Sequence, residues 1–224
     1  MGKKLTRPFV TVKFAQTLDG YIATVTGDSK WISSPESRRF AHRLRAQHDA
    51  VLVGVNTVLK DNPRLDVRLV KGKNPLKVIL DSKLRTPLSA KVVKLRPAKT
   101  IIVATTRANR RRIRQFEKMG VRILVLPAKR KGQVDLKSLL RQLKELGIRK
   151  LLVEGGSQVI TSFLKVKLVD RVIVITAPKI IGRGISSIFA LPSQRIYPEK
   201  IFSAGEDLVL VGRLKTIRIL NSIL

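Results

Sequence analysis

The segment from Lys150 to Ser157 (KLLVEGGS) carries the residue pattern with the clearest chemical meaning in the chain. An apolar run is followed by a carboxylate, two glycines and an amphipathic stretch, which predicts a strand, a tight turn and a helix. Unpaired N–H groups at a helix start attract anions, and glycines let a phosphate approach the main chain. The pattern is neither a Walker loop nor a G-x-G-x-x-G fingerprint, so a phosphate site and a plain strand-to-helix turn both explain it.

Glu154 is the acidic residue of this segment, in a chain that has only 15 acidic residues. It ends the predicted strand, and open α/β sheets place their ligands at the carboxyl ends of strands. A ligand-binding role is therefore one interpretation of Glu154. Capping of a neighbouring loop is the other.

A cluster of cations surrounds the start of a helix predicted from Asn109 to Met119. Thr105 and Arg107 come just before this helix, and Arg110–Arg112 fill its first turn. Cations at a helix N-terminus oppose its dipole, so a bound anion would stabilise this arrangement. The ribose 2′-phosphate of NADPH is a candidate, because arginine offers paired planar donors to phosphate. A solvated charged face explains the same residues equally well.

The segment from Gly54 to Arg68 concentrates polar side chains after another predicted strand. Its fifteen residues include a hydroxyl, two carboxylates and two arginines, and polar loops of this kind usually bind a ligand. Turn chemistry accounts for Asn62 and Pro63 but not for the rest.

Trp31, the only tryptophan, follows a Gly-Asp-Ser loop. It is either a core residue or an aromatic wall against a planar ring.

The elements that position these residues alternate between strand-like and helix-like patterns, which predicts one α/β domain over residues 1–224. After a helix near Gln158–Lys165 the strands follow one another without helices, so we expect a mixed sheet. The loops are expected at Lys129–Gly132 and Pro192–Pro198. The strands are predicted at Phe9–Ala15, Tyr21–Ala23, Asp49–Gly54, Leu76–Asp81, Thr100–Thr105, Val121–Leu126, Lys150–Glu154, Arg171–Thr176 and Leu208–Leu214. The other helices are predicted at Pro35–His48, Val55–Lys60, Asn109–Met119 and Leu136–Leu146.

The net charge is the unusual property of the composition: 46 Lys and Arg against 15 Asp and Glu give +31. Such a charge attracts phosphorylated ligands and polyanions alike. Aromatic residues are only 4% and scattered, which argues against a single-strand nucleic-acid binder. Cysteine is absent and the two histidines have no carboxylates at ligand spacing, so no metal is expected. No membrane span or secretory signal is recognisable, and we expect a cytoplasmic protein.

Ordered motifs give the chain a resemblance to the riboflavin-pathway reductases. That family includes the carboxyl-terminal domain of the bacterial bifunctional deaminase-reductase and stand-alone archaeal and fungal enzymes. Each motif alone is weak, but their order is specific, and the resemblance runs from Arg7 to Leu214. The motifs are Thr17–Gly20, Gly27–Ser33, Arg43–Ala46, Gly54–Arg68, Asp81–Ser82 and Glu154–Gly156.

The resemblance implies a dihydrofolate-reductase-like fold, with a mixed, mostly parallel sheet, flanking helices and antiparallel C-terminal strands. It also implies NADPH as the cofactor and a homodimer. The cofactor set, with Thr105, Arg107 and Gly155 added from the clusters above, is Ala15, Trp31, Thr57, Asp61, Ser82, Thr105, Arg107, Gly155, Gly156, Ser157, Gln158, Val159, Ile160, Thr161 and Ser162. The substrate set is Ser29, Arg45, Leu65, Arg68 and Glu154, with Arg45 and Arg68 expected to hold a 5′-phosphate.

The reaction implied by the resemblance is reduction of a ribosylamino group to ribitylamino, by hydride transfer to C1′ of the ring-opened sugar. No deaminase domain precedes the matching region, so the expected substrate is 2,5-diamino-6-ribosylamino-4(3H)-pyrimidinone 5′-phosphate, which keeps its amino group. Glu154, with Asp61 second, is the carboxylate expected to supply a proton or stabilise a cation. The alternatives are a reductase of the deaminated pyrimidine or of a pterin such as dihydrofolate. A basic nucleic-acid-binding protein is a further alternative, and weak non-specific binding in low salt is expected in any case.

Overall fold

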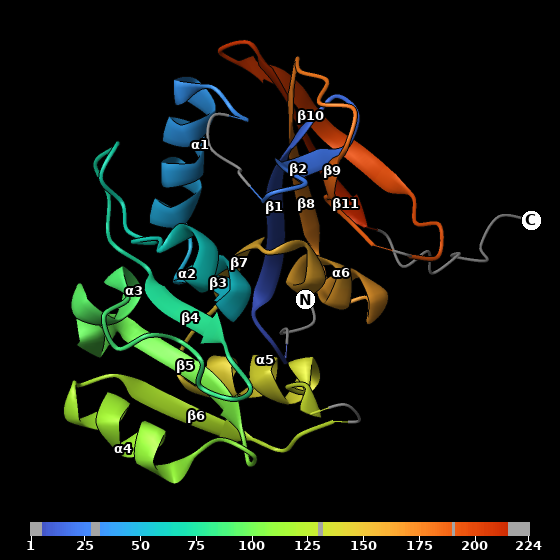
Figure 1. Ribbon diagram of the computed structural model, residues 1–224. Helices are drawn as coiled ribbons and strands as arrows, with labels where there is room; N and C mark the ends of the chain where they lie inside the picture. Colours follow the sequence, from blue (N-terminus) through green and yellow to red (C-terminus); the bar gives the residue numbers. More distant parts are fainter. Residues whose placement is uncertain (1–5, 28–31, 130–131, 190, 215–224) are drawn as a thin grey trace, which may run out of the picture.

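The computed structural model describes residues 6–27, 32–129, 132–189 and 191–214, which form a twisted sheet covered by helices (Figure 1). Ser29 and Trp31 lie outside the described residues. The main strands are β1 (Phe9–Thr17), β3 (Ala50–Gly54), β4 (Leu76–Leu80), β5 (Thr100–Thr105), β6 (Arg122–Leu126), β7 (Lys150–Gly155), β8 (Arg171–Ala177), β10 (Ile196–Ala204) and β11 (Asp207–Leu214). A separate pair is formed by β2 (Tyr21–Thr24) and β9 (Gly184–Ser186).

The nine-stranded sheet has the order β10-β11-β8-β1-β7-β3-β4-β5-β6. From β8 through β6 all neighbouring strands are parallel. The last two strands are antiparallel, β11 to β8 and β10 to β11. The mixed, mostly parallel sheet with antiparallel final strands confirms the predicted fold class.

Helices cover both faces of the sheet, because its central strands are apolar on both sides. One face packs against α5 through Leu139 and α6 through Phe163. The other face packs against α1 through Leu44, α3 through Val92 and α4 through Phe116. The helices are α1 (Pro35–Ala46), α2 (Val55–Asp61), α3 (Lys91–Lys94), α4 (Arg110–Lys118), α5 (Leu136–Glu145) and α6 (Ser157–Lys165), with a 3₁₀ turn η1 (Pro97–Lys99).

The ends of the helices follow the capping signals of the sequence. The Ser34 hydroxyl accepts a hydrogen bond from the backbone N–H of Ser37 at the start of α1. The Asn109 side chain caps α4 by accepting from the backbone N–H of Arg111 at 2.8 Å. Each cap satisfies a donor that the helix itself leaves unpaired. No helix in the described ranges combines the length and the apolar character needed to cross a membrane.

The main error of the sequence prediction concerns the region Pro192–Pro198. The sequence predicts a loop there, but β10 starts at Ile196 and includes Pro198. Proline cannot donate to a sheet ladder, and is tolerated at an edge or a bulge. Here β10 is the edge strand, and its register with β11 shifts between Pro198 and Lys200. The short elements α3 and β9 were also not predicted.

Candidate active site

A cavity of about 630 Å³ lies at the carboxyl ends of β3, β4 and β7. Its volume is in the range of small-molecule sites, and its position is where open sheets bind ligands. The small β2–β9 sheet closes one side through Ile22 and Ile185. Six of the predicted cofactor residues line the cavity, namely Thr57, Asp61, Gly156, Ser157, Gln158 and Val159.

Glycines bring α2, α6 and the sheet close together at this cavity. A Cβ on Gly54 would lie 2.7 Å from Cγ2 of Val159, and one on Gly156 would lie 3.2 Å from Oγ1 of Thr57. Gly156 precedes α6, and no side chain caps that helix. The first N–H groups of α6 are thus left for a ligand, with little side-chain bulk in front of them. This turn fits the pyrophosphate of a dinucleotide.

A second cavity of about 340 Å³ adjoins the first, since Leu80, Gln158 and Val159 line both. The second cavity also contains the predicted residues Ser82 and Ser162. Its remaining walls include three cations, Lys129, Lys137 and Lys165. Together the two cavities extend from the β2–β9 pair to the start of α5.

The predicted cation cluster lies beside this second cavity. The Thr105 hydroxyl donates to the backbone carbonyl of Ser82 at 3.0 Å. A Cβ on Gly132 would lie 3.2 Å from Nη1 of Arg107, which places the Arg107 guanidinium against Gly132. Thr105 is therefore brought next to Ser82, although 23 residues separate the two in the chain.

Four other predicted cofactor residues contribute no wall to either cavity. Ile160 is buried in the core between the sheet and α6. Thr161 is also buried, and its hydroxyl accepts a hydrogen bond from the backbone N–H of Phe189 at 3.1 Å. Ala15 packs at the border of the core on the α1 side of β1, and Gly155 is buried at the end of β7. Their contact with a cofactor stays a prediction.

Arg45 and Glu154 form a buried ion pair between α1 and β7. Nε and Nη2 of Arg45 donate to the two carboxylate oxygens at 2.9 and 2.7 Å, with side chains only 14% and 7% exposed. Burial alone would raise the pKa of Glu154, but Arg45 and then Lys13 keep that pKa below its usual value. Glu154 is therefore an anion at neutral pH.

Lys13 is the site residue that the sequence prediction missed. It lies on β1, where burial lowers its pKa, the charge of Glu154 opposes that shift and the charge of Arg45 adds to it. Lys13 and Glu154 are adjacent in the sheet, because Val12 of β1 pairs with Val153 of β7. The available signal was a lysine inside the apolar strand Phe9–Ala15, which is an uncommon place for an unpaired charge.

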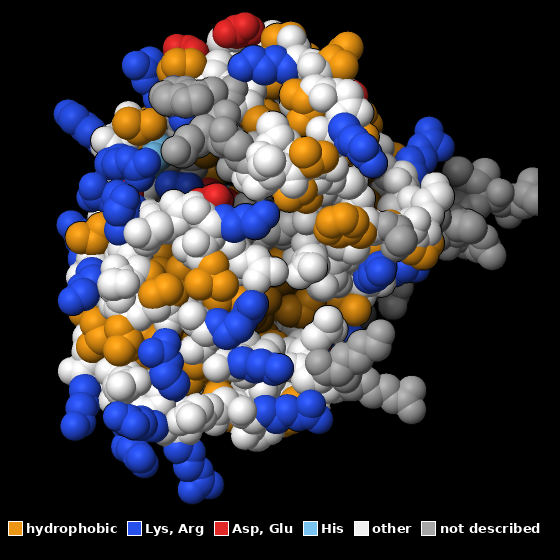
Figure 2. Space-filling model, in the orientation of Figure 1, with side chains coloured by type: hydrophobic (Ala, Val, Ile, Leu, Met, Phe, Trp, Pro, Cys, Tyr) orange, Lys and Arg blue, Asp and Glu red, His pale blue; other side chains and the backbone are white. Residues whose placement is uncertain are grey.

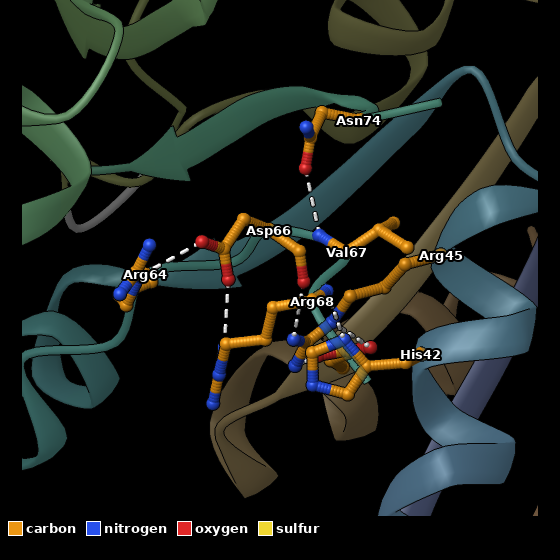
Figure 3. A network of polar contacts seen from close by, with 8 residues as sticks. His42, Arg45, Arg64, Asp66, Val67, Arg68 and Asn74 are labelled. Carbon is orange, nitrogen blue, oxygen red and sulfur yellow. Dashed lines mark hydrogen bonds and ion pairs between the residues drawn. The ribbon is translucent and has the colours of Figure 1, made fainter. Parts of the chain in front are cut away.

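The loop after α2 contacts Arg45 and carries two further cations, Arg64 and Arg68 (Figure 3). Nη1 of Arg45 donates to the backbone carbonyl of Asp66 at 3.1 Å. The Asp66 carboxylate accepts from Arg64 at 2.8 Å and from Arg68 at 2.7 Å. The side chain of Leu65 is buried in the core, so only its backbone is available to a ligand.

Asp61, the second candidate carboxylate, lies at the end of α2 and lines the first cavity. Burial raises the pKa of its carboxyl group, and the charge of Lys60 opposes this shift. The two candidate carboxylates thus differ in their electrostatic surroundings, with Glu154 held as an anion. Among the residues described by the structure, no group of three His, Cys, Asp or Glu could hold a metal ion.

Comparison with known proteins gives a family match over residues 8–221, to the RibD C-terminal domain. The chain is 48% identical over 210 residues to the riboflavin biosynthesis protein RibD of Aquifex aeolicus, covering 91% of this chain and 57% of that protein. It is 39% identical over 222 residues to the 2,5-diamino-6-ribosylamino-4(3H)-pyrimidinone 5′-phosphate reductase of Methanothermobacter thermautotrophicus, covering 93% of this chain and 99% of that protein. The chain spans about half the length of the RibD relatives, 57% and 46% in two of them.

Solved structures agree with the family match. Acinetobacter baumannii RibD superposes with a TM-score of 0.82 at 28% identity, covering 94% of this chain and 59% of that one. The riboflavin biosynthesis reductase Rib7 of Saccharomyces cerevisiae superposes with a TM-score of 0.73 at 28% identity, covering 96% and 93%. Sequence and fold lead to the same conclusion: the chain belongs to the RibD C-terminal domain family.

Proposed function

We propose that the protein reduces the ribosylamino group of 2,5-diamino-6-ribosylamino-4(3H)-pyrimidinone 5′-phosphate to ribitylamino with NADPH, in riboflavin biosynthesis, as a single reductase domain. The observation that carries this proposal is the buried Arg45–Glu154 pair, which lies beside a glycine-rich, phosphate-compatible turn at the carboxyl edge of the sheet. The archaeal relative that bears the name of this reaction, covered over 99% of its length, supports the same substrate.

NADPH supplies the hydride when it is bound. We assign its pyrophosphate to the start of α6, where backbone N–H groups have no side-chain cap. Its 2′-phosphate is assigned to the second cavity, which Ser82 and Lys129 line and beside which Arg107 lies against Gly132. A guanidinium suits a phosphate because its donors form a planar fork. The 2′-hydroxyl of NADH carries no charge that these cations could neutralise, so we expect a preference for NADPH.

The substrate is assigned to the Arg45–Glu154 side of the turn. Opening of the ribosylamine yields an imine, whose C1′ accepts the hydride and whose nitrogen takes up a proton. An ionised Glu154 stabilises the positive charge of the protonated imine, and a fixed charge in a buried site does so without reorganisation. The 5′-phosphate is assigned to Arg68, with the two donors of Arg45 that remain after its three hydrogen bonds.

A homodimer is also proposed, formed through the β10–β11 hairpin. Among the described residues, β10 is an edge strand, and Ile201 and Leu208 on the hairpin are 59% and 51% exposed. An open edge with apolar side chains is a natural pairing surface for a second copy. Replacing Ile201 and Leu208 together by Glu should shift the protein from dimer to monomer in sedimentation velocity. A wild-type monomer, or an unchanged dimer in the variant, would contradict this interface.

The positive charge supports one further proposal, weak non-specific binding of nucleic acid. Figure 2 shows Lys and Arg spread over the visible face with few acidic side chains between them. Binding through phosphates releases counterions, so it should weaken steeply as salt rises. We also propose the cytoplasmic location that the sequence predicts, without membrane attachment.

The decisive experiment measures NADPH oxidation with three substrates supplied separately: the diamino pyrimidine, its deaminated counterpart and dihydrofolate. Oxidation with the diamino compound supports the proposal, whereas oxidation only with the deaminated compound keeps the reductase and changes its substrate. Oxidation only with dihydrofolate would mean a pterin reductase. No oxidation with any of them, together with steeply salt-dependent nucleic-acid binding and no affinity for NADPH, would favour a nucleic-acid-binding protein.

A further inference from the structure

His42 is a buried polar side chain that the proposed reaction does not use. It lies on α1 and is only 3% exposed. Its Nδ1 accepts a hydrogen bond of 3.1 Å from the backbone N–H of Arg68. Arg45 follows three residues later on the same helix, so the two side chains project from the same face of α1. One face of α1 therefore holds both the Glu154 pair and the loop that carries Arg68.

Three consecutive residues of that loop are each held by a side chain (Figure 3). Arg45 donates to the carbonyl of Asp66 at 3.1 Å, and Asn74 accepts from the N–H of Val67 at 2.7 Å. His42 then accepts from the N–H of Arg68. Residues 62–75 form neither helix nor strand, so no regular backbone ladder fixes their path. The side-chain contacts define where the Arg68 main chain lies.

The charges around His42 favour the neutral ring that this contact needs. Burial, and after it the cations Arg45 and Arg68, lower the pKa of His42 to about 4. Glu154 and Asp66 act in the opposite direction but are the smaller effects. A neutral imidazole has one acceptor nitrogen, whereas a protonated one has none. At neutral pH the ring can therefore accept from Arg68.

We infer that His42 is a positioning residue for binding of the substrate 5′-phosphate, because it fixes the main chain of Arg68 beside Arg45. The inference rests on the proposed function, which assigns that phosphate to the two arginines. His42 itself does not contact the phosphate. It raises phosphate affinity by removing the freedom of the loop before the ligand arrives, which is the general benefit of preorganisation.

Two substitutions separate positioning from packing. His42→Leu keeps an apolar bulk but removes the acceptor, and leaves the N–H of Arg68 without its partner. His42→Asn keeps an acceptor oxygen near the position of Nδ1. The matched control is His48→Leu. His48 lies just after the end of α1, and its ring contacts Leu44 and Thr11 instead of the Arg68 loop. If His42→Leu does not fold, His42→Gln, whose amide lies further from the backbone than Nδ1, replaces it.

The first readout is calorimetric binding of ribose 5-phosphate, with ribose as the reference, to the protein without cofactor. Without this contact the loop must be ordered when the ligand binds, so we expect His42→Leu to weaken ribose 5-phosphate binding by roughly tenfold, or about 1.4 kcal/mol. His42→Asn should recover most of the affinity. The control variant should bind like the wild type. In the enzyme assay the same loss should appear in KM, with kcat changed by less than about twofold.

The outcomes are distinct for the inference and for the proposed function. If the wild-type protein binds ribose 5-phosphate but does not oxidise NADPH with either pyrimidine, the proposed function is overturned and the positioning role still stands. Wild-type protein with no preference for ribose 5-phosphate over ribose would overturn the phosphate assignment and the inference with it. Equal losses in His42→Leu and His48→Leu, or no recovery in His42→Asn, would mean a purely structural histidine.

Discussion

Replacement of Glu154 by Gln tests the buried ion pair directly. The change keeps the shape of the side chain but removes its charge. The buried cation Arg45 then has no partner of opposite charge in Glu154, and Lys13 adds a second positive charge nearby. One carboxamide oxygen can accept only one of the two Arg45 hydrogen bonds, and the new NH₂ group faces a donor. Breaking a buried pair on one side costs about 3–5 kcal/mol. For a chain of this size that cost lowers Tm by roughly 6–20 °C.

The assay is urea unfolding of a double-mutant cycle with Glu154→Gln, Arg45→Met and the double variant. We expect the double variant to be more stable than the sum of the single losses predicts, because it removes both charges together. Turnover with saturating substrate should fall about 100-fold in Glu154→Gln, since a fixed charge facing the reacting centre is lost. A coupling energy below about 0.5 kcal/mol, or near-normal turnover, would refute this reasoning.

Three further predictions concern residues away from this pair. Lys77 is 4% exposed and donates to the carboxyl end of α3, and burial lowers its pKa to about 8. Between pH 8 and 9.5 the unfolded chain holds more protons at Lys77 than the folded one, so Lys77 alone should raise the unfolding free energy by about 1–2 kcal/mol; Lys77→Met should remove that part of the rise in urea titrations. Arg107→Ala should weaken NADPH binding about tenfold while NADH binding stays unchanged, measured by fluorescence titration; equal losses would contradict the 2′-phosphate assignment. Gly156→Ala should reduce NADPH affinity because its Cβ would crowd Thr57 at 3.2 Å, and an unaltered Kd would exclude that contact.

The sequence predicted those parts of the fold that depend on local patterns. Asn109 caps α4, and Gly120 and Gly147 follow the helices they were expected to end. β10 was missed because its proline is tolerated only at a bulged edge, and an edge position is a property of the whole sheet.

The sequence predicted residues that the structure places at the first cavity, among them Thr57 and Gly156, but not the pairings between side chains. Arg45 and Glu154 were both assigned to the substrate, and nothing local shows that they bind each other across 109 positions of sequence. The contact between His42 and Arg68 is hidden for the same reason, since it joins a helix face to a loop backbone. The predicted contacts of Ser29 and Trp31 stay predictions, because neither lies in the described residues.

The central place of β1 in the sheet affects how the chain is made. Both neighbours of β1 come late: Val12 pairs with Val153 of β7 and with Val172 of β8. At a synthesis rate of about 5–20 residues per second, this strand waits roughly 8–30 s on the ribosome before its neighbours emerge. Until then the apolar side chains of Val10, Val12 and Phe14 have no sheet to enter. The first strand therefore stays without its sheet partners, and Lys13 meets Glu154 only after most of the chain has been translated.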